Sequence, residues 1–197
     1  MATIEAMGQK RTVTAVEDAK GFSTRDLILI AVLLAAGAVL KLTVSSFLTF
    51  AGMKPNFMIA MYCLAIILTR PRVYQAGIIG LITGFISQIP MLNATPLVNI
   101  ASELVGALVC GILLAAFLRV AKGNASLHNV VSPFIITFVA TVFSGYVFAL
   151  IVGSAMNGLP VAAMFVTYAV MVFGTATLNA ILVAILTPVL KKALKLA

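Results

Sequence analysis

Long apolar runs alternate with short polar breaks along most of the chain. The runs cover residues 27–46, 56–70, 74–90, 97–118, 130–152 and 161–190. An apolar helix of about 20 residues crosses the roughly 30 Å hydrocarbon core of a bilayer. The pattern therefore predicts an all-α integral membrane protein, a bundle of six transmembrane helices. The second run is short for a full crossing, so we expect it to use flanking residues or a thinner bilayer.

Helix-ending residues occupy the breaks between the runs. They are, in chain order, Gly52, Pro55, Pro71, Pro90, Pro96, Gly158 and Pro160. Proline cannot continue the helix that precedes it, because it has no amide hydrogen and its ring clashes with the preceding turn. No break is long enough to separate two domains. We therefore expect residues 1–22 to form a cytoplasmic tail and residues 23–197 to form a single six-helix substrate-binding domain.

The first helix has a recognisable start. Ser23 and Asp26 have the Ser-x-x-Asp spacing of a capping box. In that motif each side chain accepts a hydrogen bond from a free backbone N–H of the first turn. This spacing predicts that the first helix begins near Ser23.

Composition narrows the class of protein further. Apolar residues make up 62% of the chain and charged residues only 9%, whereas a soluble domain has about a quarter charged residues. A soluble enzyme surface is excluded. The basic residues lie at the ends of apolar runs rather than in a polar patch, which argues against nucleic acid as a partner.

The positive charges predict the orientation in the membrane. The chain has 13 lysines and arginines. With six spans and both termini inside, all of them except Lys41 and Lys54 fall on the cytoplasmic side. Cytoplasmic loops of membrane proteins carry this excess of positive charge. We therefore expect a multi-pass protein of a prokaryotic cell membrane, N-in and C-in.

Pairs of small residues four positions apart recur in several runs. They are Ala31 and Ala35, Gly80 and Gly84, Ala107 and Gly111, and Ala176 and Ala180. Small residues let helix backbones approach closely in a membrane. Each pair is explained either by packing inside the bundle or by docking to another membrane subunit.

Glu103 is the acidic residue that lies within the later apolar runs. An unpaired carboxylate is costly inside a membrane, so we expect it to face a cavity or a cation. A salt bridge to Lys41 or Lys54 would make its role structural. Alternatively, Lys54 and Glu103 are the cation and anion that bind the carboxylate and ammonium of a zwitterion such as an amino acid.

Further polar side chains precede Glu103 near the same outer turn. Gln88 closes the third run, and Asn93, Thr95 and Asn99 follow it. A helix that begins here has free backbone N–H groups suited to a ligand carboxylate. Gln88, Asn93 and Asn99 are therefore further candidates for substrate binding.

Catalysis has little support in the sequence. His128 lies in a loop without a nucleophile or metal-ligand motif, and no phosphate-binding Gly-x-x-x-x-Gly-Lys-Ser/Thr loop is present. Cys63 and Cys110 lie inside apolar runs, where we expect them to be buried as small apolar residues. We expect no enzyme activity, no metal and no cofactor in this chain, and any ATP to be used by a partner.

The short spans, the two cytoplasmic ends and Ala31-x-x-x-Ala35 together resemble the substrate-binding S component of an energy-coupling factor (ECF) transporter. Within that group the chain resembles the bacterial tryptophan-transporter family. The matching segments are residues 52–56 (Gly-Met-Lys-Pro-Asn), Arg70-Pro71-Arg72, residues 80–84 (Gly-Leu-Ile-Thr-Gly) and Asn99-Ile100. Through the first segment, Asn56 joins Lys54 as a candidate for binding.

This resemblance implies a small membrane subunit that captures a solute outside the cell. Its partners would be a transmembrane coupling subunit and two ATPase subunits, and Ala31 and Ala35 would contact the coupling subunit. The substrate would be tryptophan or a related amino acid.

One departure from the family opens an alternative substrate. Ser102 and Glu103 stand where the tryptophan family has an Asp-Lys pair, so a basic position has become acidic. A vitamin-like or amine ligand is the alternative for such an S component. Two other classes stay open: a stand-alone proton-coupled secondary transporter that uses Glu103, and a non-transporting assembly subunit.

Overall fold

The computed structural model describes residues 21–48, 54–89, 92, 95–120 and 127–195, and within these ranges every regular element is helical. The α-helices are α1 (Thr24–Leu42), α2 (Val44–Phe47), α3 (Met58–Thr69), α4 (Val73–Ile86), α5 (Pro96–Val120), α6 (Ser132–Ala149), α7 (Val161–Thr167) and α8 (Ala169–Ala193). Two π-helical segments, η1 (Leu127–Val131) and η2 (Leu150–Met156), extend α6 at its two ends.

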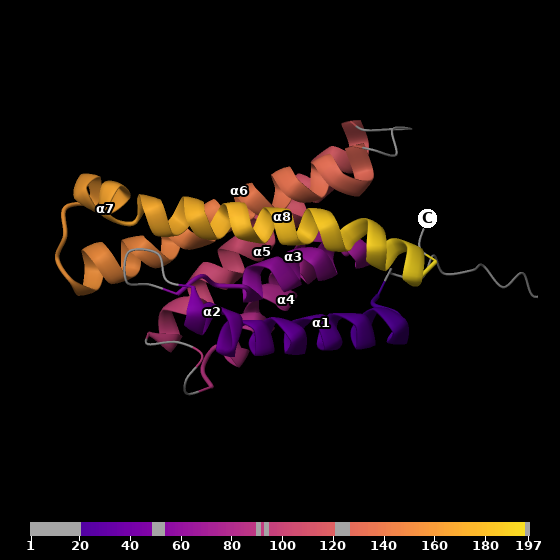
Figure 1. Cartoon of the computed structure of the whole chain (residues 1–197), viewed down its shortest axis with the longest axis horizontal. Coiled ribbons are helices and arrows are strands. Elements are labelled where there is room, and N and C mark those ends of the chain that lie inside the picture. The colour runs from indigo at the N-terminus through magenta and orange to yellow at the C-terminus, as the bar shows by residue number, and fades with distance from the viewer. Residues whose placement is uncertain (1–20, 49–53, 90–91, 93–94, 121–126, 196–197) are drawn as a thin grey trace, which may run out of the picture.

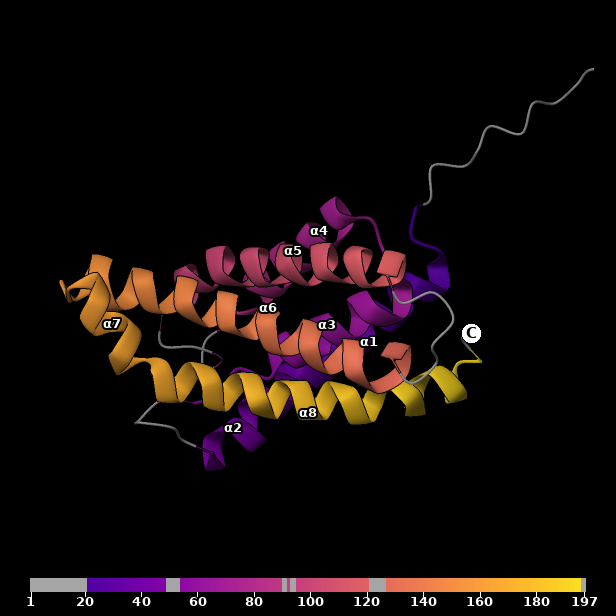
Figure 2. The same ribbon diagram turned by 90° about the horizontal axis from the view of Figure 1, so that it is seen from above.

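The long helices lie alongside one another as an elongated bundle (Figure 1). The start of α1 and the end of α8 lie at one end of the bundle, and α2 and α7 lie toward the other end, as both views show (Figures 1 and 2). The Arg25 side chain donates a hydrogen bond to the carbonyl of Leu194 and joins the two ends of the described chain directly.

Helix α3 is enclosed by the rest of the bundle. It contacts α1, α4, α5, α6 and α8, and every residue from Met58 to Leu68 is buried. The short run at 56–70 forms a helix of 12 residues that is surrounded by protein along its length. Its uniform apolarity fits this burial, since a helix buried on all sides has no polar face.

The helices are consistent with the membrane character predicted from composition. Among the described residues, three helical segments are long and apolar enough to cross a bilayer, at Leu97–Val120, Asn129–Met156 and Ala169–Ala193. Helices α3 and α4 are shorter apolar helices.

Two of the predicted runs are divided in the structure. The run at 27–46 forms two helices, because α1 ends at Leu42 and α2 begins at Val44. There the buried Ser45 hydroxyl donates a 2.7 Å hydrogen bond to the Pro55 carbonyl, which joins α2 to the segment before α3. The run at 161–190 is divided at Tyr168, between α7 and α8. The Tyr168 ring packs closely over Gly153 in η2.

The predicted capping box is confirmed. The Asp26 N–H donates to the Ser23 hydroxyl at 3.1 Å, and the Ser23 N–H donates to the Asp26 carboxylate at 3.1 Å. Helix α1 begins at the next residue, Thr24.

Small residues join α4 to α5, as one of the two readings of the pairs predicts. A Cβ atom added to Gly80 would lie 2.6 Å from both the Ala107 Cβ and the Glu103 carbonyl oxygen, and one added to Gly84 would lie 2.7 Å from the Ile100 Cα. Such distances are well below van der Waals contact. These glycines therefore allow a backbone approach that no other residue permits.

The remaining pairs differ from one another. Ala176 and Ala180 are fully buried in α8, where they pack inside the bundle. Ala31 and Ala35 are exposed on the outer face of α1.

We predict that Gly80→Ala lowers the free energy of unfolding by about 1–3 kcal/mol, the usual cost of overpacking, because both of its new contacts would be to closely packed α5 atoms. Thermal unfolding of the detergent-purified chain measures the effect. Ala116→Val adds carbon atoms at an exposed position of α5 and is the matched control. Equal melting temperatures for the two variants would contradict the close α4–α5 contact.

Candidate functional site

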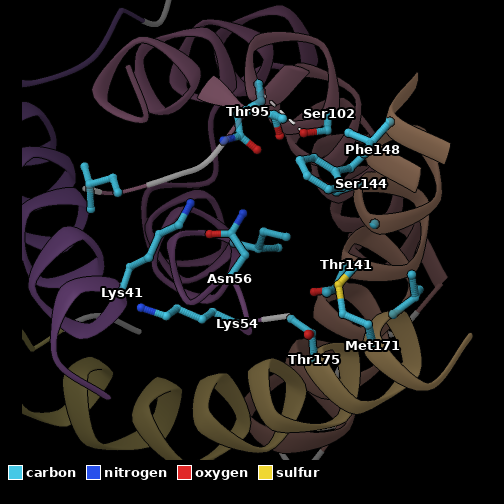
Figure 3. Close-up of a pocket in the computed structure, with 16 residues that line it drawn as sticks. Lys41, Lys54, Asn56, Thr95, Ser102, Thr141, Ser144, Phe148, Met171 and Thr175 are labelled. Atoms are coloured by element: carbon cyan, nitrogen blue, oxygen red, sulfur yellow. Dashed lines mark hydrogen bonds between the residues drawn. The ribbon is translucent and has the colours of Figure 1, made fainter. Parts of the chain in front are cut away.

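A cavity of about 440 Å³ lies in the half of the bundle away from the start of α1 and the end of α8, as its lining residues show. Its wall is built from the last turn of α1, the segment before α3, the first turns of α5, the C-terminal half of α6 with η2, and the start of α8. Segments far apart in the sequence therefore meet around one space (Figure 3).

One side of the cavity is polar and positively charged. Lys41 and Lys54 extend into it next to Asn56 (Figure 3). Thr95, Asn99 and Ser102 add amide and hydroxyl groups from the start of α5. None of the described lining residues is acidic.

The opposite side is mainly apolar. Phe148 and Met171 lie across the cavity from the lysines (Figure 3). The same wall carries the hydroxyls of Thr141, Ser144 and Thr175. The other apolar lining residues are Ile59, Leu92, Val152 and Val172. A cationic side facing an apolar side is complementary to a ligand with an acidic group at one end and a hydrophobic body at the other.

Asn56 organises the polar side. Its side-chain Oδ1 accepts a hydrogen bond from the Met58 N–H at 3.2 Å at the start of α3, and its Nδ2 donates to the Glu103 Oε1 of α5 at 2.5 Å. Its backbone carbonyl accepts from the Asn179 Nδ2 of α8 at 3.0 Å. One residue therefore holds three helices together beside the cavity.

Glu103 lies behind Asn56 and does not line the cavity. Its side chain is fully buried, and its electrostatic partner is Lys41, with no hydrogen bond between the two side chains. The Tyr62 hydroxyl lies near Glu103 and packs against Gly106, where an added Cβ would be 2.2 Å away. Glu103 is thus a buried acidic group behind the cavity wall.

Three buried polar atoms of the wall have no hydrogen-bond partner among the described residues. They are the Lys41 Nζ, the Asn99 Nδ2 and the Thr175 Oγ1. Buried polar groups in proteins are almost always satisfied by protein, water or ligand. Their position on the cavity surface marks it as a place where a polar ligand or water binds.

The structure brings together part of the set of residues predicted from the sequence. Lys54, Asn56 and Asn99 line the cavity. Gln88 does not, and its Nε2 donates to the Gly84 carbonyl at 2.7 Å within the same helical end. Asn93 lies outside the described residues.

Sequence reasoning missed four residues of the wall formed by α6 and the start of α8. Thr141, Ser144, Phe148 and Met171 lie in the middle of long apolar runs, where most residues contact lipid or core. A signal was present in the spacing of Thr137, Thr141 and Ser144, because these buried polar residues follow one face of the helix. Polar side chains inside a span face the bundle interior rather than the lipid.

Cys63 and Cys110 are buried and free, as predicted. In the part of the chain that the structure describes, no group of three or more histidine, cysteine, aspartate or glutamate side chains could hold a metal ion.

Comparison with known proteins identifies the family of this chain. The family model described as "Tryptophan transporter TrpP" matches residues 23–195. A protein of Bacillus subtilis (strain 168) named "Probable tryptophan transport protein" is 32% identical over 176 residues, which covers 87% of this chain and 94% of that protein. No solved structure matches the chain. The resemblance seen in the sequence motifs is confirmed.

We predict that Asn56→Ala lowers the free energy of unfolding by about 1–3 kcal/mol, because it leaves the buried Glu103 carboxylate without its hydrogen bond. In a Glu103→Met background the same substitution costs less, since no carboxylate is left unsatisfied. The comparison forms a double-mutant cycle measured by thermal unfolding.

The control for this cycle is Asn157→Ala, which removes an exposed asparagine whose Nδ2 bonds to the Val152 carbonyl. We expect it to be within about 0.5 kcal/mol of the parent protein. Strictly additive losses for Asn56→Ala and Glu103→Met would show that their hydrogen bond does not stabilise the bundle.

Proposed function

This chain belongs to the tryptophan transporter TrpP family, and from that membership we propose that it is the substrate-specific membrane subunit of an ATP-driven ECF-type importer. It binds tryptophan or a related amino acid from the outside and passes it to the inside together with partner subunits. The chain itself performs no enzymatic reaction and carries no cofactor.

The observation that supports this function best is the two-sided cavity. Its volume of about 440 Å³ is within the range of about 300–1,000 Å³ usual for small-molecule sites. Tryptophan has a carboxylate that suits Lys41 and Lys54, and a flat ring that suits Phe148 and Met171. Because the cavity is open at one end of the bundle, the ligand enters without crossing the apolar core.

The proposed orientation is N-in and C-in with six crossings, and the cavity facing outward. Its support is the distribution of positive charge. Among the described basic residues, Lys41 and Lys54 line the cavity, whereas Arg25 and Lys191 lie at the end of the bundle where α1 begins and α8 ends. The positive-inside rule assigns this second end to the cytoplasm.

The proposed partners are a transmembrane coupling subunit and two ATPase subunits. Ala31 and Ala35 support this role because they are exposed on α1, unlike the small residues that pack α4 against α5. An exposed pair of small residues lets a helix of another subunit approach closely in the bilayer. ATP is then hydrolysed by the partners and not by this chain.

We predict that the isolated, detergent-purified chain binds tryptophan and that Lys54→Ala weakens binding by about 1–3 kcal/mol, typical of losing a hydrogen bond to a charged group. Ligand-dependent thermal stabilisation and equilibrium dialysis measure the change. Lys192→Ala removes a lysine that does not line the cavity and should bind as the parent does. Absence of tryptophan binding by the parent chain would refute the proposal.

We predict that Ala31→Leu and Ala35→Leu, combined, abolish tryptophan uptake in cells that also express an ECF module while binding by the isolated chain is retained. The larger side chains keep the partner helix away and do not touch the cavity. Ala116→Leu, on an exposed face of α5, is the control.

An uptake assay with the purified chain alone separates a stand-alone transporter from the proposed subunit. Proteoliposomes that contain this chain alone should not accumulate tryptophan under a proton gradient. Accumulation that is lost in Glu103→Gln would replace the proposal with a proton-coupled secondary transporter.

A further inference from the structure

We propose that the cavity recognises its ligand through a carboxylate and does not require an ammonium group, so that aromatic monocarboxylates without an α-amino group are also ligands. This inference rests on the proposed function and names the substrate class of the same site. It differs from the pairing predicted from the sequence, in which Glu103 binds the ammonium of a zwitterion.

The charges around the cavity favour an anion. Lys41 and Lys54 both line it, and Glu103 is the acidic group that interacts with Lys41 from behind the wall. Asp26, the other acidic residue among those described, caps the distant start of α1. The described wall of the cavity therefore has two lysines and no carboxylate. An anionic ligand group meets groups of opposite sign there, whereas an ammonium group meets groups of its own sign.

The unsatisfied groups of the wall include two strong donors. The Lys41 Nζ and the Asn99 Nδ2 are buried without a partner in the described structure, and both can only donate hydrogen bonds. Asn99 is 2% exposed, so its amide has little access to bulk water. A carboxylate offers up to four acceptor positions and satisfies both donors at once.

The acidic residue that an ammonium group would need is out of reach. Glu103 is 0% exposed, and Asn56 stands between it and the cavity with a 2.5 Å hydrogen bond to its Oε1. Among the described lining residues, an ammonium in the cavity meets neutral hydroxyl and amide oxygens and no carboxylate. The hydroxyls of Ser102 and Thr141 donate to backbone carbonyls of their own helices, at 3.5 and 2.7 Å, so they offer an ammonium neutral lone pairs and no opposite charge.

The apolar side supplies the second half of the recognition. Phe148 and Met171 face the lysines across the cavity (Figure 3). Aromatic rings and thioethers make favourable contacts with a flat ring. A ring linked to a carboxylate by a short chain reaches both sides, whether or not the chain carries an amino group.

Three indole compounds test the proposal on the full-length, detergent-purified chain. Tryptophan has both charged groups, indole-3-propionate lacks the ammonium, and tryptamine lacks the carboxylate. We expect indole-3-propionate to bind with a dissociation constant within about tenfold of that of tryptophan, and tryptamine to bind at least about a hundredfold more weakly, which are differences of about 1.4 and 2.7 kcal/mol. Equilibrium dialysis and thermal stabilisation provide the measurement.

Two variants test the assigned roles of the charges. Glu103→Gln keeps an Oε1 acceptor for Asn56 and removes the charge. We expect it to leave the ratio of tryptophan to indole-3-propionate affinity unchanged within about threefold, because Glu103 contacts neither ligand. Lys41→Gln should weaken the binding of both tryptophan and indole-3-propionate about tenfold or more, and Lys192→Gln is the matched control. A selective loss of tryptophan binding in Glu103→Gln would overturn the proposal.

The outcomes separate this inference from the proposed function. Binding of tryptophan without indole-3-propionate would overturn the inference and leave the importer function in place. Binding of indole-3-propionate without tryptophan would support the inference and refute tryptophan as substrate. Binding of tryptamine at the affinity of tryptophan would overturn carboxylate recognition, and failure of all three compounds would overturn both proposals.

Discussion

The hydrogen bond between Asn56 and Glu103 is the interaction on which the site depends. A fully buried carboxylate is costly unless its oxygens find donors, and here the donor is the Asn56 amide at 2.5 Å. Because Asn56 also accepts hydrogen bonds from the Met58 N–H at the start of α3 and from Asn179, its bond to one oxygen of this carboxylate links α3, α5 and α8 beside the cavity. The charge of Glu103 in turn lies where it acts on Lys41.

Close packing on the other side of α5 supports the same arrangement. Gly80 lies directly against the backbone carbonyl of Glu103, so the glycine contact between α4 and α5 constrains the backbone that carries this side chain. The enclosed helix α3 fills the centre of the bundle. The cavity lies beside the segment that precedes α3, where Lys54 and Asn56 line it.

Local patterns in the sequence predicted the helices well and the site in part. The capping box at Ser23 and the close approach of Gly80 and Gly84 depend on residues near one another or on a general need for small side chains, so their signal is local. Lys54 and Asn99 were found because polar residues near the ends of apolar runs are conspicuous, and Asn56 was found through the family motif. Glu103 was found because a carboxylate inside an apolar run is costly, but its charge did not reveal which way its side chain faces. Thr141, Ser144 and Met171 were missed because the side of α6 and α8 that faces a cavity is set by neighbouring helices.

The sequence by itself determined that this is a helical membrane protein whose basic residues other than Lys41 and Lys54 lie at the opposite ends of the apolar runs. Hydropathy and charge depend on how each segment interacts with water and lipid, so they can be read without knowledge of tertiary contacts. Its motifs also determined the family. Only the tertiary structure decided that Lys41 shares a cavity with Lys54, and that Asn56 separates Glu103 from that cavity. These relations join residues as far apart as Lys41 and Thr175, and they depend on helix packing, which no local pattern of apolar and polar positions encodes.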